Sequence, residues 1–188
     1  MYPVSLAGQR LKLREFAADD TEALHKVYGN ADATRHLSFE ARTPEQVDHI
    51  VKVAMESAAA SERSEYMLAV ADIETGELIG AARIALGEHD SGQIGFALRP
   101  DHWGTGKGKE TVRLLLDLGF KKLGLHRIWG ARSPLNEISA RTMLAVGMIE
   151  EGRIRGHLFT RGVWRDSIVH SILSGEYEPG VLVNPLAN

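Results

Sequence analysis

The residues best suited to do chemistry lie in a glycine-rich segment, residues 93–110, of a chain of 188 residues. A strand pattern at 93–98 is followed by Gly104, Gly106 and Gly108, and then by a helical pattern. The first amides of a helix lack partners within it, and the helix dipole places partial positive charge there. Glycines also let a ligand approach the main chain closely. The segment therefore predicts a binding site for phosphate groups.

Two common phosphate-binding motifs do not fit this segment. A P-loop needs glycine five residues before a Gly-Lys pair, and Asp101 and Trp103 stand at the two positions concerned. The dinucleotide fingerprint needs glycine where the chain has Lys109. A nucleotide-binding protein is therefore disfavoured. What remains is another phosphate ligand, or a turn that binds nothing.

The segment resembles the pyrophosphate-binding motif of the GNAT superfamily of N-acetyltransferases. Gly106 and Gly108 match the last two motif positions, and Trp103 stands at the first, where the general motif has Gln or Arg. Trp103 and Glu110 are instead similar to the ribosomal-protein-alanine (Rim-type) branch. Further segments similar to that branch follow in order along the chain: 10–14, 119–128, 134–139, 147–152 and 162–166.

The resemblance implies an α+β fold with a GNAT-like mixed, mostly antiparallel central sheet of about seven strands and about four helices. It implies a splay between the fourth and fifth strands, 93–98 and 127–131, with acetyl-CoA bound there as co-substrate. The residues that it implies for acetyl-CoA binding are Phe96, Ala97, Leu98, Trp103, Gly104, Thr105, Gly106, Lys107, Gly108, Lys109 and Asn136.

Ser139 is implied as the catalytic acid that protonates the departing thiolate, and Asn136 reads on pattern alone as a helix N-cap. The implied reaction is direct transfer of acetyl to a primary amine, on a protein N-terminus or a small molecule, without a covalent enzyme intermediate. This reaction needs no enzyme nucleophile, which agrees with the absence of cysteine.

The general base is left unassigned. Related enzymes often carry glutamate where this chain has Gln93, and Glu40, Glu88, His89 and Asp90 are each either a base or ordinary surface. The missing carboxylate keeps open an alternative function, a non-catalytic acyl-CoA-binding sensor or scaffold.

Hydrophobic periodicity predicts the elements that position these residues. The expected strands are 10–15, 66–72, 77–86, 93–98, 127–131, 148–158 and 163–173. We expect a helix to residue 27 capped by Asp19 or Asp20, and one after Thr43 with a Thr43–Gln46 capping box. Two more helices run from the glycine-rich loop to about 123 and from Asn136 to Gly147.

Composition limits the partners. The net charge is −3 with no cysteine, so we expect neither nucleic-acid binding, nor a disulfide, nor a cysteine metal site, and the scattered histidines predict no metal. No stretch predicts a signal peptide or a membrane span, so a cytoplasmic protein is expected. Residues 1–175 are predicted to form a single domain and 176–188 a C-terminal tail; a homodimer is compatible with the sequence.

Overall fold

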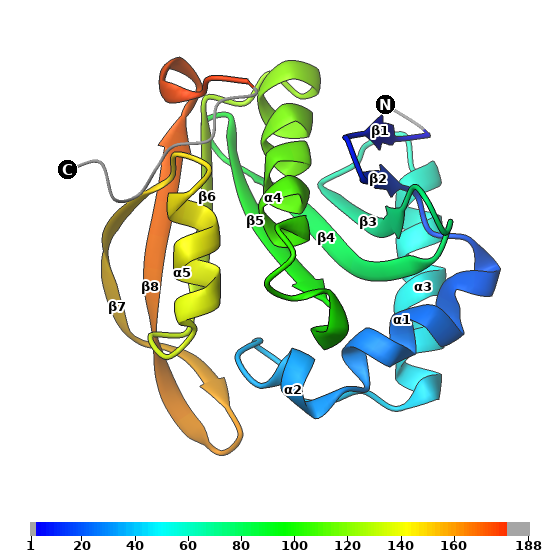
Figure 1. Cartoon of the computed structure of the whole chain (residues 1–188). Coiled ribbons are helices and arrows are strands. Elements are labelled where there is room, and N and C mark those ends of the chain that lie inside the picture. The colour runs from blue at the N-terminus through cyan, green and yellow to red at the C-terminus, as the bar shows by residue number, and fades with distance from the viewer. Residues whose placement is uncertain (1–2, 180–188) are drawn as a thin grey trace.

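The computed structural model describes residues 3–179, and this part of the chain forms a mixed α+β fold around one eight-stranded sheet (Figure 1). The strands are β1 (Ser5–Ala7), β2 (Leu11–Arg14), β3 (Glu65–Asp72), β4 (Leu78–Gly87), β5 (Ser91–Leu98), β6 (Arg127–Arg132), β7 (Ile149–Thr160) and β8 (Val163–Leu173). The α-helices are α1 (Thr21–Tyr28), α2 (Ala31–Thr34), α3 (Pro44–Ala59), α4 (Lys107–Asp117) and α5 (Glu137–Leu144). A π-helical segment, Leu118–Lys122, extends α4.

The sheet has the strand order β1-β2-β3-β4-β5-β6-β8-β7. Its strand pairs are antiparallel except β5 and β6, which are parallel and are connected through α4. Pairing of β5 with β6 runs from Ser91↔Arg127 to Ile94↔Gly130, although β5 continues to Leu98. The predicted mostly antiparallel sheet and the splay between these two strands are therefore confirmed.

Helices cover both faces of the sheet (Figure 1). Leu115 and Leu116 of α4 are fully buried in the larger hydrophobic cluster, with β-strand side chains such as Ile128. Val47 and Val51 of α3 belong to a second cluster on the other face. Successive side chains of a strand point to opposite faces, which is how one sheet supplies both clusters.

Local sequence signals gave most of the helix ends correctly. Thr43 and Gln46 form the predicted capping box at the start of α3: the Gln46 amide donates to Thr43 Oγ1 at 3.3 Å, and the Thr43 amide to Gln46 Oε1 at 3.1 Å. The predicted side-chain cap of α1 is wrong. Asp20 instead accepts from the Arg14 guanidinium, at 2.6 and 2.8 Å, and from the Ala17 amide. A buried carboxylate is better compensated by a cation than by one helix amide.

Strand β1 and helix α2 are additions to the predicted elements. At the other end of the chain, Tyr177 contacts Phe120 with ring centroids 5.2 Å apart and donates to Asp117 Oδ1 at 3.1 Å. The rest of the predicted tail, residues 180–188, lies outside the described residues, and the single-domain boundary stays a prediction. None of the described helices is long and apolar enough to cross a membrane.

Candidate functional site

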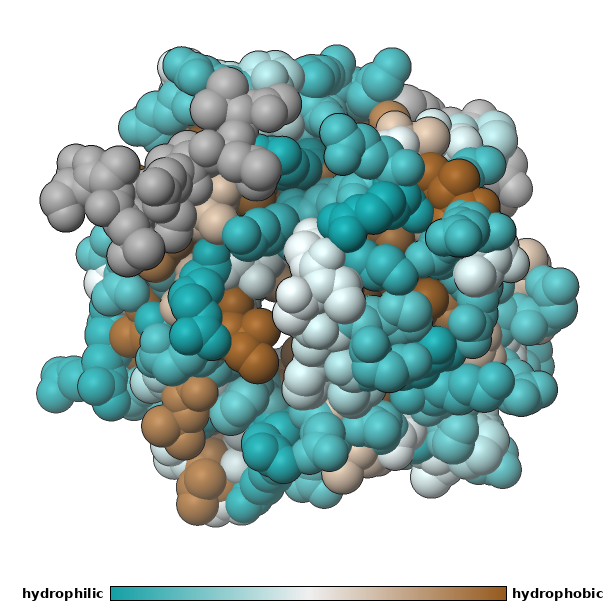
Figure 2. All heavy atoms as spheres, viewed as in Figure 1, coloured by the Kyte–Doolittle hydropathy of each residue, from teal (hydrophilic) through white to brown (hydrophobic). Residues whose placement is uncertain are grey.

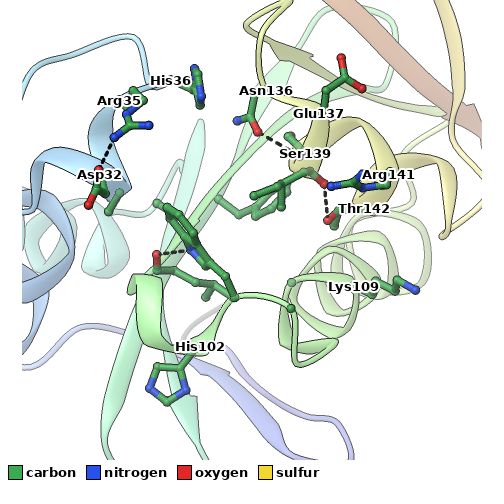
Figure 3. A pocket seen from close by; sticks show the side chains of 18 of the residues that line it. Asp32, Arg35, His36, His102, Lys109, Asn136, Glu137, Ser139, Arg141 and Thr142 are labelled. Atoms are coloured by element: carbon green, nitrogen blue, oxygen red, sulfur yellow. Dashed lines mark hydrogen bonds and ion pairs between the residues drawn. The ribbon is translucent and has the colours of Figure 1, made fainter.

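A cavity of about 870 Å³ opens where β5 and β6 part. Its walls are the end of β5, the glycine-rich loop before α4, the start of α5 and residues 32–37 around α2 (Figure 3). The predicted site residues that line it are Phe96, Ala97, Leu98, Trp103, Gly104, Thr105, Gly106, Gly108, Lys109, Asn136 and Ser139. The fold thus brings together every predicted site residue except Lys107.

The glycine-rich loop presents the N-terminus of α4 to this cavity. Gly106 is the N-cap, with φ +83°, a left-handed conformation that favours glycine, and no side chain caps the helix. The amides of the first turn therefore have no partner within the helix. The loop is held from behind by Arg10, whose guanidinium donates to Thr105 O at 2.8 Å and to Glu110 at 3.2 Å.

Lys107, the first residue of α4, is turned away from the cavity. Its Nζ donates to Asp72 Oδ2 at 2.7 Å and lies 3.0 Å from Nδ1 of His102. Hydrogen bonding to this ammonium holds the pKa of Asp72 below its usual range. Lys107 is not among the residues that line the cavity, whereas exposed Lys109 is.

The end of β5 contributes an open strand edge. Beyond Ile94, β5 is paired with β4 alone, as in the pairs Ala82↔Phe96 and Gly80↔Leu98. The indole Nε1 of Trp103 donates to Leu98 O at 2.9 Å and so fixes the aromatic ring at this edge. An unpaired strand edge offers main-chain donors and acceptors to an extended ligand.

Helix α5 supplies the opposite wall. Asn136 is its N-cap, as predicted from the pattern, because its side-chain oxygen accepts from the Ser139 amide at 3.0 Å. Figure 3 shows the Asn136 amide nitrogen facing the space between the walls. The half-buried Ser139 also lines the cavity, whereas the neighbouring Thr142 donates its hydroxyl proton to Ile138 O at 2.8 Å.

The wall around α2 was missed by the sequence analysis. Asp32, Arg35 and His36 stand across the cavity from Asn136 and Ser139 (Figure 3). Asn30 caps α2 by accepting from the amides of Asp32 and Ala33. That Asn-x-Asp-Ala pattern is the local signal that could have indicated a short helix here.

The β7–β8 hairpin supports this wall from outside. Arg165 Nη1 donates to the carbonyls of His36 and Leu37, at 3.0 and 3.1 Å, and Arg161 donates to Thr34 O at 3.2 Å. Asp166, which follows Arg165, instead binds Arg153 and the Gly156 amide within the hairpin. Asp166 therefore has a structural role in the hairpin.

The candidate bases do not meet at the cavity. Glu88 and His89 are exposed at the β4–β5 turn, with side chains 94% and 95% exposed, and Asp90 follows them. That turn lies at the opposite end of β5 from Leu98. Glu40 is likewise not among the lining residues. The cavity is lined by two carboxylates, those of Asp32 and Glu137.

On the surface the site is a hollow near the centre of the view, with hydrophobic residues beside it (Figure 2). Leu135 and Ile138 are exposed, at 79% and 50%, and both line the cavity. The site thus joins free helix amides and three cations, Arg35, Lys109 and Arg141, to apolar side chains and an open strand edge. Free helix amides and cations suit a ligand that carries phosphate groups.

Comparison with known proteins agrees with this geometry. Residues 10–149 match the family described as Acetyltransferase (GNAT) domain. The chain is 31% identical over 176 residues to a Bacillus subtilis (strain 168) protein named uncharacterized N-acetyltransferase YoaA. This match covers 92% of this chain and 98% of YoaA.

Solved structures share the fold. The ribosomal-protein-S5-alanine acetyltransferase of Vibrio fischeri superposes with a TM-score of 0.76 at 24% identity, over 94% of this chain and 100% of that one. The spermidine N-acetyltransferase of Vibrio cholerae, in complex with CoA and spermine, gives 0.78 at 21% identity, over 90% and 99%. The resemblance predicted from the sequence is confirmed: the chain belongs to the GNAT family and is an N-acetyltransferase.

Proposed function

We propose that the protein transfers an acetyl group from acetyl-CoA, bound in the 870 Å³ cavity, directly to a primary amine. The observation that carries this proposal is the convergence of the free amides at the start of α4 with the unpaired edge of β5. The amides suit the diphosphate, and the edge suits the amide-containing pantetheine arm. Gly106 allows close approach of the phosphates, and Lys109 supplies a positive charge.

In this proposal, Phe96, Ala97 and Leu98 hold the thioester end through the main chain, and the Asn136 amide nitrogen binds the arm. The amine nitrogen attacks the carbonyl carbon, and the carbon–sulfur bond breaks. Ser139 donates its hydroxyl proton to the departing sulfur and recovers the proton that the nitrogen sheds, through water. Holding amine and thioester together in the cavity supplies the rest of the rate enhancement.

The alternative is a protein that binds acyl-CoA without turnover. The two are separated by incubating the chain with acetyl-CoA and a panel of amines and measuring the free thiol released. Thiol release that depends on an amine supports the transferase. Tight CoA binding without thiol release from any amine would favour the sensor.

The binding half of the proposal is tested separately by Gly106→Val. A side chain here would cover the amides, and its Cβ would lie 3.2 Å from Arg10 Nη2. Gly76→Val is the matched control, because Gly76 has a similar φ of +73° but nothing within 4 Å of an added Cβ. We expect Gly106→Val to weaken CoA binding at least tenfold and Gly76→Val to leave it unchanged. Equal CoA affinity in both variants would contradict the loop assignment.

A further inference from the structure

The wall around α2 carries an excess of positive charge. Its cations are Arg35, which lines the cavity beside His36, and Arg161 and Arg165, which reach the main chain of the same wall from the hairpin. The acidic residue of this wall that lines the cavity is Asp32, and it forms an ion pair with Arg35. The arginines of the hairpin therefore outnumber the carboxylates that could neutralise this wall.

Arg165 is the least compensated of these cations. Its Nη1 binds two carbonyl oxygens, and its Nε is buried without an acceptor among the described residues. Neither Arg165 nor Arg161 has a carboxylate partner within residues 3–179. Burial lowers the pKa of Arg165, and the neighbouring Arg161 lowers it further, as expected where positive charge is not balanced.

The same positive charges act on His36, which lines the cavity. Burial lowers the pKa of its imidazole, and so do the charges of Arg35, Arg165 and Arg161. The charges named here are all positive, which agrees with the contacts of Arg161 and Arg165 with the main chain of this wall. The other cations of the cavity, Lys109 and Arg141, belong to the opposite side, with α4 and α5.

We propose that the acceptor is a primary amine that also carries an anionic group, and that this anion is bound at the Arg35 and His36 wall. This inference rests on the proposed acetyl transfer and names the class of its second substrate. Polycationic amines are disfavoured, because a second ammonium would meet the same positive field. The anion is a carboxylate or a phosphate, both of which accept hydrogen bonds from guanidinium groups.

The field also bears on the missing base. A positive potential favours the neutral form of a bound amine over its ammonium, and the neutral form is the one that attacks. Gln93 occupies the β5 position where a carboxylate base was expected from the resemblance. The arginines of the hairpin and the α2 wall would lower the pKa of the bound amine without accepting its proton, which passes to water.

The first test compares short primary amines that differ in the charge of the group at their other end. 4-Aminobutyrate, its amide and 1,4-diaminobutane form one series, and 2-aminoethyl phosphate with ethanolamine forms another. Rates are compared at equal concentrations of neutral amine. We expect at least a tenfold higher kcat/KM for the anionic member of a series, decreasing as salt is raised, and the lowest value for the diamine. The two series distinguish carboxylate from phosphate.

The second test reduces the positive electrostatic field with Arg161→Gln, which removes one exposed cation near the wall. Arg155→Gln is the control, because Arg155 is exposed on the same hairpin but acts on Asp166 and not on His36. Arg161→Gln should reduce the anionic preference at least threefold and raise the pKa of His36 measured by NMR. Arg155→Gln should change neither.

The outcomes separate this inference from the proposed function. Turnover with equal kcat/KM for the carboxylate and its amide, or with a preference for the diamine, would overturn the anionic acceptor and leave acetyl transfer intact. An unchanged His36 pKa in Arg161→Gln would overturn the positive field. CoA binding without turnover of any amine would overturn both proposals.

Discussion

Lys107 and Asp72 form an ion pair with an Nζ–Oδ2 distance of 2.7 Å, which ties the first residue of α4 to the last residue of β3. Both side chains are mostly buried, at 16% and 10% exposure. Asp72 is held in turn by the amides of Glu74 and Thr75. The lysine of the glycine-rich loop thus positions the helix terminus, and its charge does not point into the cavity.

This pair predicts different roles for two neighbouring lysines. Lys109→Ala should weaken CoA binding about fivefold and reduce its salt dependence, because an exposed charge contact contributes up to about 1 kcal/mol. Lys107→Ala should instead lower the free energy of unfolding, since it leaves the Asp72 carboxylate buried and unpaired. CoA titrations at several salt concentrations check the first effect, and denaturant unfolding checks the second. A smaller salt dependence in Lys107→Ala than in Lys109→Ala would contradict this assignment.

A second ion pair predicts acid sensitivity. Glu151 accepts from Arg127 Nη1 at 2.8 Å and from Ser171 at 2.7 Å, and these bonds lower its pKa from 4.5 to about 2. A depressed carboxylate pKa stabilises the fold above pH 4.5, and this contribution is lost as the pH falls toward 2.

Glu151→Gln should therefore lower the free energy of unfolding at pH 6. The decrease of this free energy between pH 4.5 and pH 2 should also be smaller than in the wild type. Urea unfolding of both proteins across this range is the measurement. A parallel pH dependence in the two proteins would show that another group controls acid stability.

The sequence predicted well those features that depend on neighbouring residues. The capping box of Thr43 and the N-cap role of Asn136 need contacts over three residues only, and both were found. The glycine-rich loop was likewise predicted to lead into a helix, and α4 begins within that loop, at Lys107.

Contacts between distant segments were not predictable in this way. Arg165 binds the carbonyls of His36 and Leu37, which lie 129 and 128 residues away in the sequence, and nothing near either segment marks the contact. Asp20 has the right type and place for a cap, yet Arg14 from the preceding strand takes its carboxylate. The wall around α2 depends on such contacts, which is why the sequence predicted the cavity residues of the glycine-rich loop and α5 but not those of this wall.

The proposed acid role of Ser139 can be separated from general damage to α5. Ser139→Ala should lower kcat at least tenfold while CoA affinity stays near that of the wild type. Thr142→Val is the control, because Thr142 also lines the cavity but its hydroxyl proton is already donated to Ile138 O. Stopped-flow thiol release and CoA titration measure both quantities. Equal kcat in wild type and Ser139→Ala would leave protonation of the thiolate to water.

Arg132 is expected to position the loop that leads into α5. Its guanidinium, 8% exposed, donates to the carbonyls of Ser133 and Pro134, to His170 Nε2 at 3.1 Å and to Glu150 at 3.3 Å. Burial lowers the pKa of His170 most, and Arg132 lowers it further, so the ring stays neutral and accepts this bond.

Removing the Arg132 guanidinium should displace Asn136 and Ser139, because this group holds the main-chain carbonyls of the loop before them. We expect Arg132→Met to lower the free energy of unfolding by about 3 kcal/mol, because it leaves carbonyls and His170 without their donor. KM for acetyl-CoA should rise more than kcat falls, since Asn136 shifts while the Ser139 hydroxyl is retained. Arg132→Lys should not restore KM, because one ammonium cannot donate to all four acceptors that the planar guanidinium of Arg132 binds. Full rescue by lysine, measured by initial rates over a range of acetyl-CoA concentrations, would show that only the charge matters and would refute the positioning role.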